Sequence, residues 1–114
     1  MSAFEAVLAS VMRQRGVTAC LIVDAQDGVV IDSTLQFGMK GHVFAALIAS
    51  LFRKARQSVD AAGFGDADFL TLEAEQGRVC AVGNGSVVLI AVADVRTNLG
   101  LLRVALTKAR GSLG

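Results

Sequence analysis

The chain has 114 residues, and its 54% hydrophobic content and mean hydropathy of +0.58 exceed what a monomeric domain of this size usually needs. Eleven Lys and Arg residues against ten Asp and Glu residues give a net charge of +1, so no overall field draws the protein to nucleic acid or an anionic membrane. Neither proline nor a linker-like tract interrupts the sequence, and we expect residues 1–114 to form a single domain.

The first predicted element is a helix that begins near Ser2. Ser2 and Glu5 have the spacing of a capping box in front of an apolar series. Arg13 and Arg15 suit the negative end of the helix dipole, and Gly16 suits the turn that follows.

A strand pair is predicted next. Residues 17–23 form a continuous apolar run, which is typical of a strand covered on both faces. The polar segment 24–28 ends in Asp-Gly, a strong signal for a hairpin turn. Residues 29–33 should return antiparallel, with Val29 and Ile31 pointing inward.

The longest predicted helix, residues 39–62, is unusual because its first half is apolar nearly all round. One stripe at spacings of three and four consists of Phe44, Ile48, Leu51, Ala55 and Val59. A second row of small residues, Gly41, Ala45 and Ala49, would let another backbone approach closely. We infer that one face packs on the core of the chain and another meets a partner, such as a second copy.

Three more strands and a helix complete the prediction. Residues 69–73 alternate apolar and polar side chains like a half-exposed edge strand, and residues 78–82 follow after a turn. Residues 87–92 form a second strand buried on both faces. The last helix should be capped by Thr97 or Asn98, with its apolar series at Leu99, Leu102, Leu106 and Ala109.

The predicted order is helix, two strands, helix, three strands, helix. Central strands covered on both faces need helices above and below the sheet, so we expect an α+β domain with three layers, α/β/α. An edge strand with few charges invites pairing with another chain. We therefore predict a homodimer joined by the edge strand and the long helix, at Gly41, Ala45, Ala49, Phe69, Thr71 and Glu73.

The succession of elements resembles the Roadblock/dynein light chain family. The resemblance is carried by Gly16-Val17-Thr18-Ala19, by the hairpin from Val23 to Val30, and by Asn98 to Arg103 at the start of the last helix. It implies a profilin-like fold: a five-stranded antiparallel sheet with the long helix on one face and the terminal helices on the other. It also implies a homodimer that partners, and often activates, a small Ras-like GTPase.

Nothing in the sequence indicates an enzyme. No lysine follows a glycine, so a phosphate-binding GxxxxGK[ST] loop is absent. His42 and Ser50 lie more than two helical turns apart, too far for a hydrogen-bonded nucleophile and base. One histidine and two distant cysteines, Cys20 and Cys80, give no plausible metal site, and both thiols are expected to be buried and reduced. We expect neither a cofactor nor a metal.

An arginine supplied to a GTPase in trans is also not expected. Helix termination and the solvated half of the long helix account for most of the arginines that could be exposed, Arg13, Arg15, Arg53, Arg56 and Arg78. The family resemblance further implies that such proteins act by positioning the residues of the GTPase itself.

The leading hypothesis is a homodimeric interaction module that binds and regulates a small Ras-like GTPase, with Lys40, Arg53, Lys54 and Arg56 as its polar contact. One alternative is a small-molecule sensor with a pocket between the long helix and the sheet, near Cys20, Phe44 and Phe52. Another is a structural adaptor in a larger complex. The apolar runs are too short to span a bilayer, and no basic region precedes one as in a signal peptide, so a cytoplasmic location is expected.

Overall fold

The computed structural model describes residues 4–35 and 40–113. Its elements occur in the predicted order: α1 (Glu5–Met12), β1 (Val17–Asp24), β2 (Val30–Leu35), α2 (Gly41–Ala61), β3 (Phe69–Ala74), β4 (Gly77–Asn84), β5 (Val87–Ala93) and α3 (Leu99–Arg110). Within the described residues, no helix is both long and apolar enough to cross a membrane.

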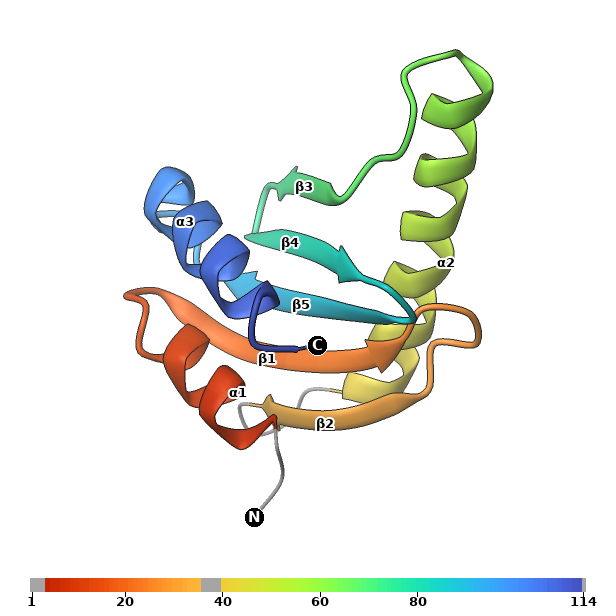
Figure 1. Ribbon diagram of the computed structural model, residues 1–114. Coiled ribbons are helices and arrows are strands. Elements are labelled where there is room, and N and C mark those ends of the chain that lie inside the picture. Colours follow the sequence, from red (N-terminus) through yellow and green to blue (C-terminus); the bar gives the residue numbers. More distant parts are fainter. Residues whose placement is uncertain (1–3, 36–39, 114) are drawn as a thin grey trace.

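The five strands form one sheet in the order β2-β1-β5-β4-β3, and every neighbouring pair is antiparallel. Figure 1 shows α2 on one face of this sheet and α1 with α3 on the other. The predicted three-layer α+β fold is confirmed, as is the position of β3 at an edge.

Each face of the sheet has its own core. Cys20 and Ile22 of β1 pack with the buried side chains of α1 and α3, whereas Leu21 and Val23 pack with those of α2. β5 alternates in the same way, with Leu89 on the first side. Because successive side chains point to opposite faces, a strand with a helix layer on each side must be apolar throughout. This explains the two continuous runs in the sequence.

The inward residues predicted for β2 are wrong. Val29 and Ile31 are 60% and 46% exposed, and Val30 packs instead against the core under α2. The register explains the shift, because Ile22 pairs with Asp32 while the next residue of β1 pairs with Val30. Ile31 is therefore the extra residue of a bulge, and one extra residue reverses the in-out alternation.

The ends of the helices depend on local chemistry. The predicted capping box cannot be assessed, since Ser2 lies outside the described residues; Phe4 is the residue before α1 and provides no side-chain cap. In α3 the prediction is confirmed, because Asn98 Oδ1 accepts a hydrogen bond from the backbone N–H of Leu101 at 3.0 Å. The predicted buried series of α3 is confirmed at Leu102, Leu106 and Ala109.

The long helix α2 reaches beyond the sheet. Its predicted start at Met39 lies outside the described residues, and it ends at Ala61, where Gly63 adopts a φ of +87°. The backbone N–H of Phe64 then donates to Val59 O at 2.9 Å, the six-to-one bond of a Schellman motif. The C-terminal half of α2 projects past β3 in Figure 1, and Phe64 at its tip is 82% exposed.

Candidate functional site

The row of small residues on α2 lies against the sheet of the same chain. Ala45 and Ala49 are fully buried in the core under α2. Gly41 is buried too, and a Cβ there would lie only 2.5 Å from Leu35 Cδ1. These three residues were predicted at a homodimer interface, and this is corrected: they provide the close approach of the helix to its own sheet and present no surface to a partner.

The exposed side of α2 carries a different apolar row. Val43, Leu47 and Leu51 are 50%, 65% and 40% exposed, and they follow one another at intervals of four residues along the helix. Residues spaced in this way share one side of a helix. Their regular spacing was visible in the sequence, but so was that of the small residues, and the sequence could not tell which row faces the sheet.

Lysines flank this exposed row. Lys54 lies seven residues after Leu47, so helical periodicity places the two on the same side of α2, and Lys40 is the residue immediately before the helix. Both lysines are exposed. The outer side of α2 is therefore an apolar strip with a positive charge near each end.

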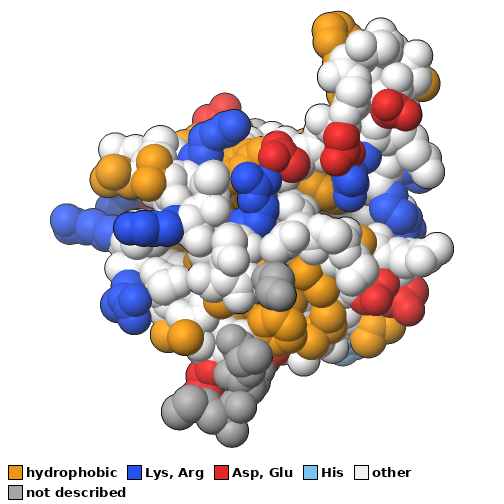
Figure 2. All heavy atoms as spheres, viewed as in Figure 1, with side chains coloured by type: hydrophobic (Ala, Val, Ile, Leu, Met, Phe, Trp, Pro, Cys, Tyr) orange, Lys and Arg blue, Asp and Glu red, His pale blue; other side chains and the backbone are white. Residues whose placement is uncertain are grey.

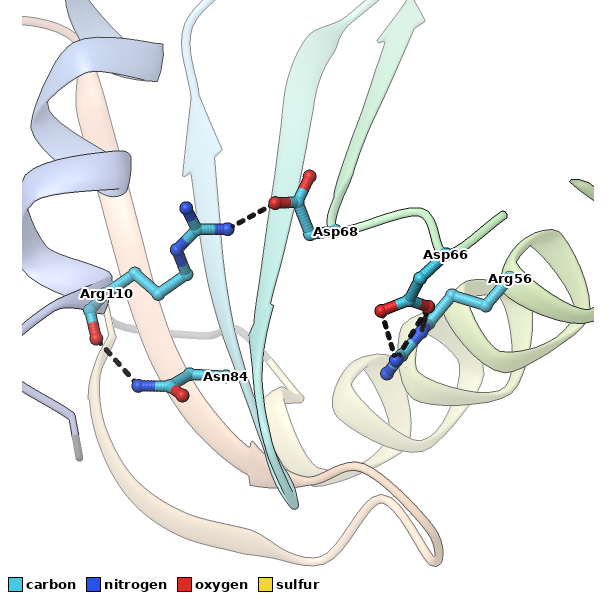
Figure 3. A network of polar contacts seen from close by, with 5 residues as sticks. All are labelled: Arg56, Asp66, Asp68, Asn84 and Arg110. Atoms are coloured by element: carbon cyan, nitrogen blue, oxygen red, sulfur yellow. Dashed lines mark hydrogen bonds and ion pairs between the residues drawn. The ribbon is translucent and has the colours of Figure 1, made fainter. Parts of the chain in front are cut away.

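The two arginines predicted beside these lysines are already engaged within the chain. Arg53 Nη1 donates to Ala25 O in the first hairpin at 2.9 Å. Arg56 donates through Nε and Nη2 to the two carboxylate oxygens of Asp66, at 2.9 and 3.0 Å (Figure 3). The structure thus separates the four predicted contact residues into two lysines on the outer face and two arginines with structural contacts.

The edge strand β3 offers its backbone. Leu70 and Leu72 pack toward the α2 side, whereas Phe69 packs against the core under α1 and α3. Thr71 and Glu73 are exposed, and Glu73 lies 3.6 Å from Arg78 Nε on β4. Because side chains leave a strand above and below the sheet, Phe69, Thr71 and Glu73 are placed on its α1/α3 face. A second strand would add through main-chain groups on the free side of β3.

The two edges of the sheet differ. β2 contains a bulge and the charged Asp32, two features that discourage pairing with another strand. β3 is paired with β4 in unbroken register from Phe69 to Ala74, and Glu73 is its single charged residue. β3 is therefore the edge better suited to extend the sheet.

The proposed ligand pocket between α2 and the sheet does not form as predicted. Cys20 faces α1 and α3, on the opposite side of the sheet from Phe44 and Phe52, so the three cannot line one cavity. Phe52 is buried, and its ring fills the space over Gly83, where a Cβ would lie 3.1 Å from Phe52 Cε1. A hollow lies instead at the start of α3.

The two thiols are free and buried, as predicted. Burial raises the pKa of Cys20 to about 12 and also raises the pKa of Cys80. Such thiols are poor nucleophiles because the thiolate is the reactive form.

The acidic hairpin is a structural turn, as predicted. Asp24 Oδ1 accepts hydrogen bonds from the backbone N–H groups of Gln26 and Asp27 at 2.8 and 3.2 Å, and these bonds hold the pKa of Asp24 below its usual value.

Comparison with known families assigns the domain. Residues 3–94 match the Roadblock/LC7 domain. The chain belongs to this family. The match includes the first helix, all five strands and α2, so it covers both surfaces described above.

Individual relatives agree with this assignment. An uncharacterized protein of Methanocaldococcus jannaschii, MJ0714, is 28% identical over 108 residues, 95% of this chain and 91% of the relative. The structure of Myxococcus xanthus MglB matches with a TM-score of 0.88 and 25% identity, covering 97% of this chain and 84% of MglB. A Schizosaccharomyces pombe profilin matches with a TM-score of 0.72 at 13% identity over 98% and 96% of the two chains, which confirms the profilin-like fold.

Proposed function

We propose that this Roadblock domain forms a homodimer through α2 and β3, and that the dimer binds and regulates a small Ras-like GTPase without supplying catalytic residues. The observation that carries the proposal is the exposed row Val43, Leu47 and Leu51 on the outer side of α2. The similarity to Myxococcus xanthus MglB and the role implied by the family resemblance support the assignment of the partner.

A symmetric pair would bury this row twice. In a two-fold dimer the same surface serves both subunits, so six large apolar side chains would leave water together. Fully burying one Val or Leu side chain is worth about 1.5–3 kcal/mol relative to leaving it exposed. Each of these side chains is already partly buried in the single chain, so the gain per residue on dimerisation is smaller than this. Together, the six side chains offset much of the cost of association.

The edge strand supports the same arrangement. β3 lies at the open edge of the sheet, on the side toward which the C-terminal half of α2 projects (Figure 1). Pairing of two β3 strands would join the sheets of the two subunits through main-chain hydrogen bonds. The interface would then use side chains of α2 and the backbone of β3 together, which fixes the position of the two helices and the register of the two paired strands.

The proposed role toward a GTPase is supported by the cationic side chains on and beside α2. Lys40 and Lys54 stand on the outer face, so in a dimer they would flank the paired helices as exposed cations. Arg53 and Arg56 lie nearby on the same helix, although both make contacts within the chain. We propose Lys40, Arg53, Lys54 and Arg56 as the polar contact, with the two lysines making the larger contribution.

The first test is the mass in solution, measured by light scattering after size exclusion. The detector should be refractive index, because the chain contains neither Trp nor Tyr. A dimer of two 11.8 kDa chains has a mass of 23.6 kDa, and this mass should persist on dilution. A monomer at all concentrations would disprove the dimeric platform.

The second test is binding to Ras-like GTPases encoded in the same genome, loaded with GDP or with a non-hydrolysable GTP analogue. The double variant Lys40→Glu/Lys54→Glu should weaken binding, and its mass is measured on the same sample because Lys54 lies on the same side of α2 as Leu47 of the proposed dimer contact. The matched control is Arg13→Glu/Arg15→Glu, a pair of exposed cations near the end of α1, on the other face of the sheet. Equal binding by wild type and the lysine variant would remove these residues from the contact. A dimer that binds no GTPase would favour the structural adaptor instead.

A further inference from the structure

The helix α3 carries an exposed apolar surface of its own. Leu101 and Val104 are 63% and 64% exposed, and Val95, in the segment that leads into the helix, is 40% exposed. Leu101, Val104 and Lys108 are spaced by three and four residues, so they share one side of α3, away from the buried Leu102. This strip lies on the opposite face of the sheet from α2 (Figure 1).

A hollow of about 670 Å³ adjoins the strip at the start of α3. It lies between the turn that follows α1 and the segment that enters α3, and its walls include Arg15, Thr18, Asp94, Arg96, Asn98 and Leu101. Apolar and cationic side chains therefore border the same depression. A peptide with an apolar side chain next to a carboxylate side chain would suit this depression.

The charges of the chain are unevenly distributed. Residues 4–16 and 94–113 contain six cationic side chains and two carboxylates, a net charge of +4, whereas the rest of the chain has five cations and eight carboxylates, a net charge of −3. The overall net charge of +1 conceals this separation. In Figure 2, Lys and Arg side chains gather on the side of α1 and α3, with hydrophobic patches between them.

Several of these cations form no ion pair within residues 4–35 and 40–113. Arg96 contacts Asp94 at 3.1 Å and Arg110 contacts Asp68 at 2.7 Å. Among the described residues, no ion pair involves Arg13, Arg15 or Lys108. Their charge is therefore available to an external carboxylate.

We propose that the α3 face, defined by Val95, Leu101, Val104 and Lys108 together with Arg15 and Arg96, is a second docking surface that binds an acidic, amphipathic segment of another protein. The apolar side chains of that segment would cover Leu101 and Val104, and one of them would enter the hollow. Its carboxylates would meet Arg15 and Lys108, and they would share Arg96 with Asp94, its partner within the chain. The excess of positive charge argues for an acidic partner, and the hollow argues for a peptide rather than a flat lipid surface, which would leave the depression unfilled.

The position of this surface gives it a role beyond the proposed dimer. Because α2 and α3 lie on opposite faces of the sheet, a dimer joined through α2 and β3 leaves both α3 faces open. The dimer could then hold a GTPase on one side and link it to a second protein on the other.

The test is selection from a phage-displayed library of random 16-residue peptides against the immobilised wild-type protein. Enriched peptides should combine bulky apolar residues with more Asp and Glu than Lys and Arg. Their affinity should fall at least about tenfold in Leu101→Ser/Val104→Ser and in Arg15→Glu/Arg96→Glu, and it should weaken with salt because exposed charges are screened. The matched control is Val29→Ser in the first hairpin, where an apolar side chain of nearly equal exposure, 60%, is changed away from both α3 and the proposed dimer contact.

Circular dichroism establishes that each variant is folded, and two independent double variants guard against a local distortion by either one. No enrichment, enrichment of basic peptides, or peptides whose binding ignores both double variants would overturn the proposal. Binding to phosphatidylserine vesicles without any peptide enrichment would overturn it in favour of a membrane surface. Retained GTPase binding in the two α3-face variants would separate this surface from the proposed GTPase contact.

Discussion

Arg110 Nη1 donates to Asp68 Oδ2 at 2.7 Å, which ties the last turn of α3 to the residue before β3. Two residues earlier, Asp66 accepts both of its hydrogen bonds from Arg56 of α2 (Figure 3). The segment that enters the edge strand is thus held from both faces of the sheet. Since β3 is the edge proposed to pair with a second subunit, these two contacts would hold the strand in place for that pairing.

The contact between Asp68 and Arg110 should make stability depend on pH. The Arg110 guanidinium holds the pKa of Asp68 below its ordinary value, so the ion pair stabilises the folded state above the unfolded pKa of about 4. This contribution is lost as pH falls through the lowered folded pKa. Asp68→Asn should cost about 0.5–1 kcal/mol at pH 7, as expected for a well-formed pair near the surface.

Urea unfolding of wild type and Asp68→Asn at pH 7 and at about pH 2.5 measures this effect, and the difference between the two proteins should shrink at the lower pH. The control is Asp60→Asn, an exposed carboxylate on α2 for which no ion pair occurs among the described residues. A difference that stayed constant with pH would show that Asp68 acts through something other than its charge.

A single charge on the outer side of α2 should separate the subunits of the proposed dimer. Leu47 and Leu101 are 65% and 63% exposed in one chain, and they lie on opposite faces of the sheet. Leu47→Glu places two carboxylates near the two-fold axis of the proposed dimer, where burial of unpaired charge is costly. Its mass by light scattering should drop toward 11.8 kDa, whereas Leu101→Glu should remain at 23.6 kDa. If Leu101→Glu alone dissociated the dimer, the subunits would meet through α3.

The sequence predicts the layers of this fold better than its surfaces. The continuous apolar runs of β1 and β5 require cover on both faces, whatever the details of pairing, and this made the three layers predictable. The bulge at Ile31 depends instead on which residue of β1 meets which residue of β2, and no local signal in residues 29–33 shows it. The same limit applies to α2, whose small row and large apolar row have equal periodicity, so the side facing the sheet was not determined.

Close contacts between α2 and the β1–β2 hairpin determine which of the two rows faces the sheet. Gly28, in the first hairpin, has a φ of +73°, and a Cβ there would lie 2.8 Å from Ala46 Cα on α2. Gly41 approaches Leu35 just as closely. A helix can lie this near the β1–β2 hairpin only if it turns its small residues toward the sheet, and larger residues then remain outside. Such contacts join positions far apart in sequence, so they could be recognised only in the folded chain.

Gly28→Ala should therefore be far more damaging than Gly85→Ala. Both glycines lie in hairpin turns with positive φ, +73° and +61°, but a Cβ added at Gly28 would meet α2, whereas one added at Gly85 would have no other atom within 4 Å. Gly85→Ala should cost about 1 kcal/mol from backbone strain. Gly28→Ala adds overpacking against a helix backbone, for a total of about 3 kcal/mol. Equal losses in urea unfolding would mean that α2 moves away at little cost.

Neither cysteine should react with a thiol reagent while the protein is folded. With a pKa of about 12 from burial, Cys20 is almost wholly protonated at pH 8, and burial raises the pKa of Cys80 in the same direction. A thiol reagent such as dithiobis(nitrobenzoate) should label neither in the native protein within minutes, and both in concentrated guanidinium chloride. Rapid labelling of the native protein would contradict the burial of both thiols.

The two thiols should respond differently to loss of the proposed dimer. Cys80 lies on β4 opposite Thr71 of the edge strand, whereas Cys20 lies on β1, between β2 and β5. If β3 is stabilised by a second subunit, Leu47→Glu should increase local opening of β3 and speed the labelling of Cys80 more than that of Cys20. Mass spectrometry of the labelled peptides over time distinguishes the two sites. Equal acceleration at both would indicate global unfolding, and no acceleration at either in a monomeric variant would show that β3 needs no partner for its stability.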